Sequence, residues 1–208
     1  MVSAFLFDIG NVIIHFDFSK AARRLAPFCT VGPETALERV ASLTDPLERG
    51  ELSVEEFVSE ASKRIGFSGS STQFVEAFED IFELNQPVVD WIGVLEERGY
   101  PLHLLSNTNA IHVPFFESTY PVFEAFTGRI YSHEVGVMKP DPEIYQKAIE
   151  KLELDPATTI YLDDRPENII GGNEAGLQSI LYEASRHDEI LRKTEQFIIG
   201  GEPFFESF

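Results

Sequence analysis

Residues 4–8 read AFLFD, a short apolar run that ends in a carboxylate. Runs of the same kind recur along the chain, and none of them alternates between apolar and polar residues. Such runs are typical of strands that are buried on both faces of a parallel sheet. The further runs are LHLLS (102–106), RIYS (129–132), TIYLD (159–163) and QSILY (178–182). The opening stretch therefore predicts the first strand of an α/β sheet.

Helical patterns separate these runs. One of them has Asp141 in the N-cap position and Pro142 in its first turn, which is a common way for a helix to begin. The others end before Gly99 and Gly176. Alternation of strands and helices favours a Rossmann-like parallel sheet sandwiched by helices. The predicted helices span residues 87–98, 142–152 and 166–175.

The segment from residue 17 to residue 85 is different, because it shows helical patterns without a clear strand. Ser53 and Glu56 form a capping-box pattern at the start of one helix. On one face of another predicted helix lie Phe74, Phe78, Ile81 and Phe82. We expect a small helical cap (17–85) inserted after the first strand of a core formed by residues 1–16 and 86–208.

The chain is strongly acidic, with 16 Lys and Arg against 35 Asp and Glu and a net charge of −19. Such a surface repels nucleic acid and anionic lipid, so neither is expected as a partner. An anionic substrate requires local positive charge or a metal ion to approach this protein. The apolar tail FIIGGEPFFESF (197–208) either packs back on the core or forms a subunit contact. The sequence is therefore compatible with either a monomer or a homodimer.

Localisation is predicted from cysteine usage and from the first residues. Cys29 is the single cysteine, so no intrachain disulfide can form, which suits a reducing cytoplasm. The first residues are apolar but contain Asp8 and lack a basic segment, unlike a secretory signal peptide. No uninterrupted apolar run approaches the roughly 18 residues of a membrane span. We expect a cytoplasmic protein with no membrane partner.

Polar side chains follow the predicted strands at the points where the strands end. In open α/β sheets, ligands bind outside the carboxyl ends of the strands. Each such residue alone has a structural explanation as a turn, cap or surface residue. Adjacent carboxylates at a buried strand end, however, repel one another unless a cation or hydrogen-bond donors satisfy them. The residues are Asp8, Ser106 and Asn107, Lys139, and the pair Asp163 and Asp164.

Together these groups meet the needs of phosphoryl transfer. A carboxylate, Asp8, can act as nucleophile by forming an aspartyl-phosphate. Mg²⁺ shared by Asp8 and Asp164 neutralises phosphate charge, with Lys139 as a further positive charge. The hydroxyl of Ser106 and the N–H of Asn107 are expected to bind phosphate oxygens. The predicted partner is a small phosphorylated metabolite.

The motifs resemble those of the haloacid dehalogenase-like superfamily. The matching stretches are FLFDIGNVI, LLSNTN, GVMKPDPEIY and IYLDDRPENIIGGNEAG, which span residues 5–176. The resemblance implies a Rossmann-like core, a helical cap after the first motif, and Mg²⁺. It also implies Asp8 as nucleophile, Ser106 and Lys139 at the phosphate, Asp164 on the metal, and Asp163 as an indirect or water-mediated ligand. Asn11 of the first motif joins the phosphate-binding candidates.

The first motif and the segment ERGELSVEEF (48–57) are most similar to bacterial phosphatases that act on α-D-glucose 1-phosphate. A sugar phosphate is therefore one candidate substrate. One position departs from most phosphatases of the superfamily, which have an acid/base Asp two residues after the nucleophile. Here that residue is Gly10, whose carbonyl can still bind Mg²⁺. Another carboxylate, Asp17 or an acid of the cap, could take the missing role.

Three rival functions stay open on the sequence. Haloacid dehalogenases also lack the second Asp, but they need no metal, so they do not account for adjacent Asp163 and Asp164. A catalytically inactive binding protein agrees with Gly10 and disagrees with the intact Asp8, Lys139 and Asp164. A phosphotransferase or mutase is the third alternative. The five histidines show no close ligand spacing, and we expect surface or loop positions for them: His15, His103, His112, His133 and His187.

Overall fold

The computed structural model describes residues 2–199. The end of the expected core range and most of the apolar tail, residues 200–208, lie outside the described residues. In the described range, no helix is long and apolar enough to cross a membrane.

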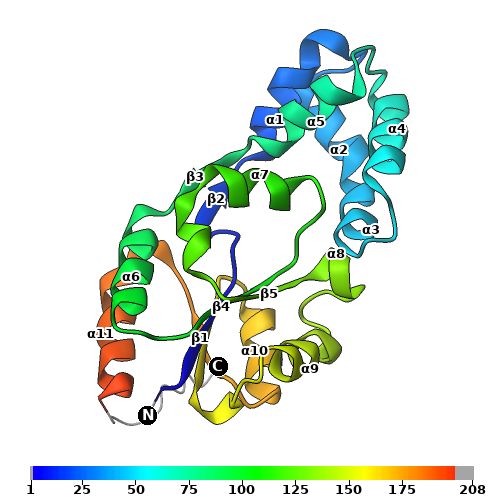
Figure 1. The fold of residues 1–208 in the computed structure, drawn as a ribbon. Coiled ribbons are helices and arrows are strands. Elements are labelled where there is room, and N and C mark those ends of the chain that lie inside the picture. Colours follow the sequence, from blue (N-terminus) through cyan, green and yellow to red (C-terminus); the bar gives the residue numbers. More distant parts are fainter. Residues whose placement is uncertain (1, 200–208) are drawn as a thin grey trace.

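The described residues form a parallel sheet in the order β5-β4-β1-β6-β7 (Figure 1). The first strand of the chain is central, and the chain extends the sheet first on one side of it and then on the other. The strands are β1 (Ala4–Phe7), β4 (Leu102–Ser106), β5 (Gly128–Tyr131), β6 (Thr159–Asp163) and β7 (Gln178–Leu181). All five predicted strands are present, each within a residue of its expected bounds.

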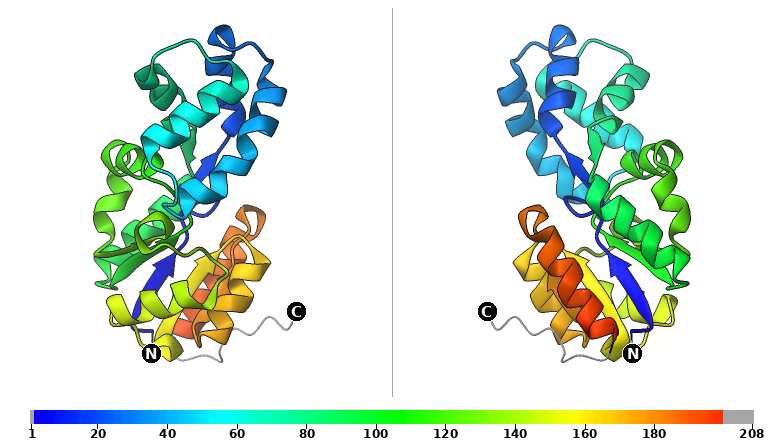
Figure 2. Two further views of the ribbon diagram at one scale, coloured as in Figure 1. Left: turned by 90° about the vertical axis from the view of Figure 1, so that its right-hand side faces the viewer. Right: turned by 90° about the vertical axis from the view of Figure 1, so that its left-hand side faces the viewer.

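Both faces of the sheet are covered by helices (Figures 1 and 2). Successive side chains of β1 point to opposite faces, because the side-chain period of a strand is two. Phe7 packs edge-on against Trp91 on one face, with ring centroids 5.7 Å apart, while Leu6 joins the cluster around Tyr145 on the other. The first face is covered by α6 (Gln86–Glu97) and α11 (His187–Ile198), and the second by α9 (Pro142–Lys151) and α10 (Pro166–Glu174). The predicted α/β class is confirmed.

Helix α10 lies very close to the sheet because it carries two glycines. A Cβ on Gly172 would lie 2.5 Å from Ser179 Oγ and 2.6 Å from Tyr161 Cδ1. A Cβ on Gly171 would lie 2.7 Å from the ring of Tyr145. Glycine at these positions therefore sets how near the helix approaches the strand that leads to the acidic pair.

A group of helices lies between β1 and the rest of the sheet in sequence, and it extends away from the sheet in space (Figure 1). We call it the helical insert. Its helices are α1 (Phe18–Leu25), α2 (Pro33–Val40), α3 (Thr44–Glu48), α4 (Val54–Ile65) and α5 (Ser71–Glu79). The capping box that was predicted from Ser53 and Glu56 begins α4, with both of its hydrogen bonds formed. Two helices of the core face this insert, α7 (His112–Thr119) and α8 (Ser132–Val135).

Two short strands connect the insert to the core. β2 (Ile14–Phe16) leads out and β3 (Phe82–Leu84) leads back, and the two pair in antiparallel fashion. At their base the Asn85 amide donates to the Val12 carbonyl at 2.7 Å and to the Tyr182 hydroxyl at 2.9 Å. The exit and return of the chain are thus held together by a buried side chain.

The expectation that residues 17–85 contain no strand is wrong, because β3 lies within them. The predicted helical face through Phe82 is also wrong: α5 ends at Glu79, and Phe82 belongs to β3. Ile81 and Phe82 are buried, and a short apolar run of this kind is compatible with a helix or with a strand. The spacing of apolar residues alone therefore did not distinguish the two conformations. The pairing with β2 decides the matter.

Candidate active site

The carboxyl ends of three adjacent strands bring the predicted residues together. Asp8 follows β1 directly, Ser106 is the last residue of β4, and Asp163 is the last residue of β6. In the register, Phe7 lies opposite Leu104 on one side and Leu162 on the other. The next residues along all three strands therefore meet at one edge of the sheet.

Lys139 lies under this edge and is almost fully buried. Its ammonium contacts Asp8 Oδ1 at 2.9 Å and Asp163 Oδ2 at 2.6 Å, and it donates to the Leu105 carbonyl at 2.8 Å. An ammonium has three hydrogens, so these acceptors occupy all of them. Lys139 was expected on both phosphate and nucleophile; in this structure its contacts are with the nucleophile candidate and Asp163.

The side chain of Asn107 holds the Lys139 backbone in place. Asn107 Oδ1 accepts from the Lys139 N–H at 2.8 Å, and its Nδ2 donates to the Lys139 carbonyl at 3.0 Å. This two-point contact orients the lysine toward the strand ends. The predicted phosphate contact of Asn107 involved only its backbone N–H, and that prediction stays untested.

Asp163 is fully buried and accepts four hydrogen bonds. Besides Lys139, the Tyr161 hydroxyl donates to Oδ2 at 2.5 Å, while the Arg165 N–H and the Asn168 amide each donate to Oδ1 at 2.9 Å. A carboxylate offers about four acceptor positions, so Asp163 is satisfied by the protein itself. It anchors Lys139, and a metal ligand must come from its neighbours.

A divalent cation fits between Asp8 and Asp164. Single oxygens of Asp8, Asp163 and Asp164 lie within 4.8 Å of one another. Asp8 uses Oδ1 for Lys139 and for the Ile9 N–H, and Asp164 uses Oδ2 for the Asn11 amide at 3.0 Å. One oxygen on each carboxylate is left for a hard cation, which prefers such ligands.

Asn11 lies beside the acidic pair. Its amide donates to Asp164 Oδ2, and the prediction that Asn11 binds phosphate stays untested. Its φ of 55° lies in the left-handed region, which asparagine adopts more readily than most residues. The turn places Gly10 and Asn11 above the strand end.

Electrostatics also favour a cation here. Burial raises the pKa of Asp8 to about 7, with Asp163 and Asp164 adding to the effect against the attraction of Lys139. Burial likewise raises the pKa of Asp164. Burial alone would lower the pKa of Lys139, but Asp163 and Asp8 outweigh it and the pKa is raised. The lysine is therefore charged at neutral pH, and the raised pKa values of Asp8 and Asp164 indicate that a further positive charge would stabilise their ionised forms.

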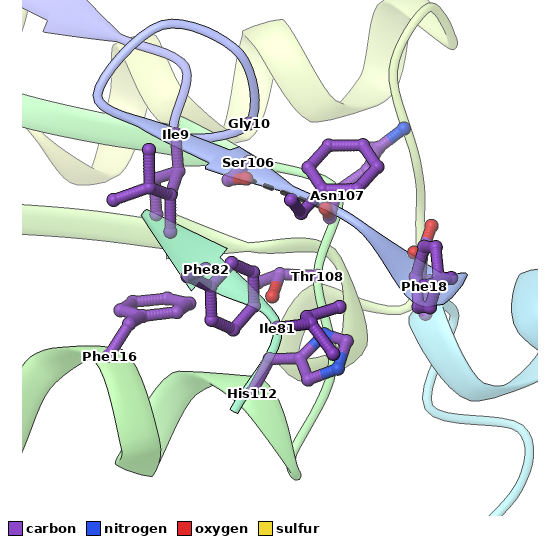
Figure 3. Close-up of a pocket in the computed structure, with 13 residues that line it drawn as sticks. Ile9, Gly10, Phe18, Ile81, Phe82, Ser106, Asn107, Thr108, His112 and Phe116 are labelled. Atoms are coloured by element: carbon purple, nitrogen blue, oxygen red, sulfur yellow. Dashed lines mark hydrogen bonds between the residues drawn. The ribbon is translucent and has the colours of Figure 1, made fainter. Parts of the chain in front are cut away.

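A cavity of about 90 Å³ lies beside these strand ends, between the core and the helical insert (Figure 3). The core contributes Ser106 and Asn107, which lie next to each other at the end of β4 (Figure 3). The insert contributes Phe18 and Glu48. The other lining residues are Ile9, Gly10, Ile14, Phe16, Ile81, Phe82, Thr108, His112 and Phe116. Apolar and aromatic side chains form most of the wall, and polar groups cluster where the strands end.

Two lining residues were missed by the sequence reasoning or placed wrongly. His112 is buried rather than on a surface or in a loop: its ring contacts the Phe78 carbonyl at 3.1 Å and the Asn109 amide at 3.0 Å. His103 is also buried, in β4. Glu48 was not singled out, although it begins the ERGELSVEEF stretch that we quoted for the resemblance. Only the fold shows that this stretch meets the core.

Comparison with known proteins places this site in a family. Residues 2–176 match the family model of haloacid dehalogenase-like hydrolases. The chain belongs to that family. The predicted resemblance is thus confirmed over most of the chain, and the family motifs coincide with the strand ends that converge on Asp8.

Individual relatives of this hydrolase agree with the assignment. It is 28% identical over 188 residues to D-ribitol-5-phosphate phosphatase of Bacteroides thetaiotaomicron, covering 86% of this chain and 91% of the relative. A HAD family enzyme from the same organism, solved in complex with magnesium and inorganic phosphate, is 25% identical with a TM-score of 0.77, covering 88% of this chain and 96% of that chain. The L-2-haloacid dehalogenase of Xanthobacter autotrophicus shares the fold with a TM-score of 0.65 and 14% identity, covering 98% of this chain and 85% of that chain.

Proposed function

We propose that this hydrolase is a Mg²⁺-dependent phosphatase that acts on a small phosphomonoester through an aspartyl-phosphate on Asp8. The observation that carries the proposal is the state of Asp8: Lys139 and the Ile9 N–H hold its Oδ1, its Oδ2 accepts no hydrogen bond within residues 2–199, and its carboxylate lies in one group with Asp164. A nucleophilic carboxylate needs this combination of a fixed orientation and a free oxygen.

The residues divide the work according to their contacts. Asp8 attacks phosphorus, and Lys139 keeps its carboxylate oriented and compensates its charge. Ser106 and the Asn107 N–H bind the phosphate oxygens, and Asn107 also positions Lys139 through its side chain. Asp8, Asp164 and the Gly10 carbonyl would hold Mg²⁺, with Asp163 contributing indirectly. When bound, Mg²⁺ supplies the positive charge that a phosphate needs at so acidic a protein.

The relatives support a small phosphorylated substrate. One similar protein is named as a phosphatase of D-ribitol 5-phosphate, and one similar structure was solved in complex with magnesium and inorganic phosphate. The cavity of about 90 Å³ also suits a small organic group. A polyol or sugar phosphate is accordingly the substrate class that we propose to test first.

We further propose that residues 17–85 act as a cap domain over the site, with residues 1–16 and 86–208 as the core domain. The lining of the cavity by both parts supports this division. A cytoplasmic location, with no nucleic-acid or membrane partner and a monomeric or homodimeric state, accords with the single cysteine and the charge of −19.

The test uses p-nitrophenyl phosphate with Mg²⁺ and then with excess EDTA. We expect turnover that is lost on chelation and restored by added Mg²⁺. Metal-independent chloride release from 2-chloropropionate would assign the chain to the dehalogenases instead. Phosphate transfer to added acceptors in place of hydrolysis would indicate a phosphotransferase or mutase. Absence of turnover, with the folded protein still binding ligands, would indicate an inactive binding protein.

A further inference from the structure

Hydrolysis through an aspartyl-phosphate on Asp8 needs a second group that acts as general acid and base. The alcohol that leaves phosphorus must gain a proton, and the water that attacks the aspartyl-phosphate must lose one. Asp8 cannot serve, because its carboxylate is bonded to phosphorus between the two steps. At Gly10 the space for a side chain is limited, since a Cβ there would lie 3.0 Å from Cε1 of the Phe16 ring. The proton donor must come from elsewhere.

The other carboxylates near the strand ends are engaged. Asp163 accepts four hydrogen bonds. Asp164 accepts from Asn11 and belongs to the metal group. Asp17, which the sequence left as an alternative, caps α1 by accepting from the Ser19 N–H at 2.9 Å and lies outside the cavity wall.

Glu48 is the carboxylate that lines the cavity together with Ser106 and Asn107. Among the residues that the structure describes, no other Asp or Glu is part of that wall. Within residues 2–199, the Glu48 side chain makes no hydrogen bond and no ion pair with the protein. A half-buried carboxylate without a partner, beside the expected phosphate position, is available to a ligand.

The backbone around Glu48 is fixed to the core. The Ser132 hydroxyl donates to the Glu48 carbonyl at 2.6 Å, and the same hydroxyl accepts from the Thr108 N–H at 3.0 Å. Two residues further on, Gly50 has a φ of 69°, and a Cβ there would lie 2.3 Å from the His133 carbonyl oxygen. The end of α3 therefore lies directly on α8 and the loop after β4, and this contact holds Glu48 in the wall of the cavity that Ser106 also lines.

The surroundings of Glu48 keep its carboxyl able to exchange a proton near neutral pH. Burial raises its pKa to about 7, and Asp45 on the same helix raises it further. The positive charges of Arg165 and Lys139, which face it from the core, act in the opposite direction. A group of this kind is present in both protonation states at the pH where most enzymes work.

We propose that Glu48, on the helical insert, is the general acid and base of this phosphatase; the proposal rests on the proposed function. In the first step an Asp8 oxygen bonds to phosphorus, the bond from phosphorus to the leaving oxygen breaks, and protonated Glu48 gives that oxygen its proton. In the second step the Glu48 carboxylate takes a proton from water as the water oxygen bonds to phosphorus. Inorganic phosphate leaves, and Asp8 and protonated Glu48 are regenerated.

Glu48→Gln tests this role, because glutamine has the same shape and cannot exchange the proton. With phenyl phosphate, a poor leaving group, kcat/KM should fall about 10²- to 10⁴-fold. With p-nitrophenyl phosphate, whose leaving group needs little protonation, the first step should survive, so a burst of p-nitrophenolate should precede slow turnover. The limb of the wild-type kcat profile near pH 7 should disappear in Glu48→Gln.

Glu51→Gln is the matched control, since Glu51 is an exposed carboxylate three residues away and should leave all of these values unchanged. Thermal unfolding of each variant checks the fold, and Glu48→Asp should retain part of the activity on phenyl phosphate.

Two outcomes would overturn the role of Glu48: folded Glu48→Gln with phenyl phosphate turnover within threefold of wild type, or an equal loss on both substrates with no burst. Failure of the proposed function looks different. In that case wild type itself shows no Mg²⁺-dependent turnover of either substrate, and the role of Glu48 is rejected together with it.

Discussion

The neighbours of Asp8 hold its carboxylate in one orientation and raise its pKa. Lys139 and the Ile9 N–H fix Oδ1 at 2.9 and 2.7 Å, so the side chain cannot rotate freely. Burial raises the pKa of Asp8 to about 7, which makes the carboxylate dependent on nearby positive charge for its ionised form. The lysine supplies part of that charge, and a cation beside Asp164 would supply the rest.

Asp8→Asn is expected to remove nearly all turnover of p-nitrophenyl phosphate. The amide has the size of the carboxylate and is held by the same neighbours, but it cannot accept the phosphoryl group. Loss of a group that acts as part of a catalytic unit costs on the order of 10³ to 10⁶ in rate. Steady-state assays, with mass spectrometry to exclude deamidation, measure the effect. More than a tenth of wild-type activity in intact Asp8→Asn would reject Asp8 as nucleophile.

Among the elements, α10 determines how accurately the acidic pair is placed. It packs on β6 through Gly171 and Gly172, and the ring that Gly172 approaches is that of Tyr161. Tyr161 in turn donates its hydroxyl to Asp163. The distance between helix and strand is thus linked to the hydrogen bonds of the site.

Gly172→Ala should lower the free energy of unfolding by about 1–3 kcal/mol, because the added methyl group overpacks the contact with Tyr161 and Ser179. Gly93→Ala in α6 is the matched control, since a Cβ there meets nothing within 4 Å. A glycine in a helix interior is less stable than alanine by up to about 1 kcal/mol, so the control should be neutral or more stable. Urea unfolding compares the two. Equal effects of both substitutions would contradict the close-packing explanation.

The contact between α7 and α5 joins core and insert through His112. Its ring lies parallel to that of Phe78, with centroids 4.8 Å apart, and its Nε2 contacts the Phe78 carbonyl. Burial lowers the pKa of His112 from its usual 6.5 to about 4, so the folded protein holds the neutral ring. The carbonyl contact requires the hydrogen on Nε2.

This histidine should make stability depend on pH. Below pH 6.5 the unfolded chain binds a proton at His112 that the folded protein does not take up until about pH 4, so stability is lost as the pH falls through this window. The advantage of wild type over His112→Asn should be roughly 2 kcal/mol smaller at pH 5 than at pH 7.5. Urea unfolding at the two pH values measures it, with exposed His15→Asn as the control. A pH-independent difference would show that His112 is not held neutral.

Over the whole molecule, the excess of acidic residues adds to the electrostatic repulsion among the carboxylates that the fold brings together at the site. The chain carries a net charge of −19, and the site concentrates Asp8, Asp163 and Asp164 within a few ångströms. Lys139 is the one ammonium with ion pairs to two of these carboxylates in the described part of the chain. A bound divalent cation should therefore change both the activity and the stability of the protein.

Asp164→Ala should weaken Mg²⁺ binding and raise the Mg²⁺ concentration needed for activity. Without metal, this variant should be as stable as wild type or more stable, because one of three mutually repelling carboxylates is removed. In wild type, Mg²⁺ at about 100 times its Kd should add about 2.7 kcal/mol of stability. Calorimetric titration and thermal unfolding test the two statements. Equal Mg²⁺ affinity in wild type and variant would exclude Asp164 from the metal site.

The effect of Mg²⁺ should also grow with pH. The raised pKa of Asp8 means that the folded metal-free protein binds a proton between pH 3.8 and about 7 that the unfolded chain has released, so this group destabilises the fold as the pH rises. Mg²⁺ competes with that proton. The rise in unfolding temperature on adding Mg²⁺ should accordingly be larger at pH 8 than at pH 5.5, and a constant rise would show that Asp8 does not bind the metal.

The five strands of the large sheet, the helices α6, α9 and α10, and the group of residues at the strand ends could all be predicted from the sequence. Buried parallel strands are local apolar runs, and their polar ends must meet at one edge, so Asp8, Ser106 and Asp163 could be placed together without coordinates. The family motifs that carry these residues are also local in sequence.

The contacts of each group at the site could not be predicted before the fold was known. The pairing of β2 with β3, the ion pair of Lys139 with Asp163, the contact of Asn11 with Asp164 and the position of Glu48 join segments that are distant in the sequence. No local pattern encodes such contacts, because they depend on how separate segments of the chain pack against each other in the fold. The ERGELS stretch is visible in the sequence, but only packing against Ser132 turns its first glutamate toward the site.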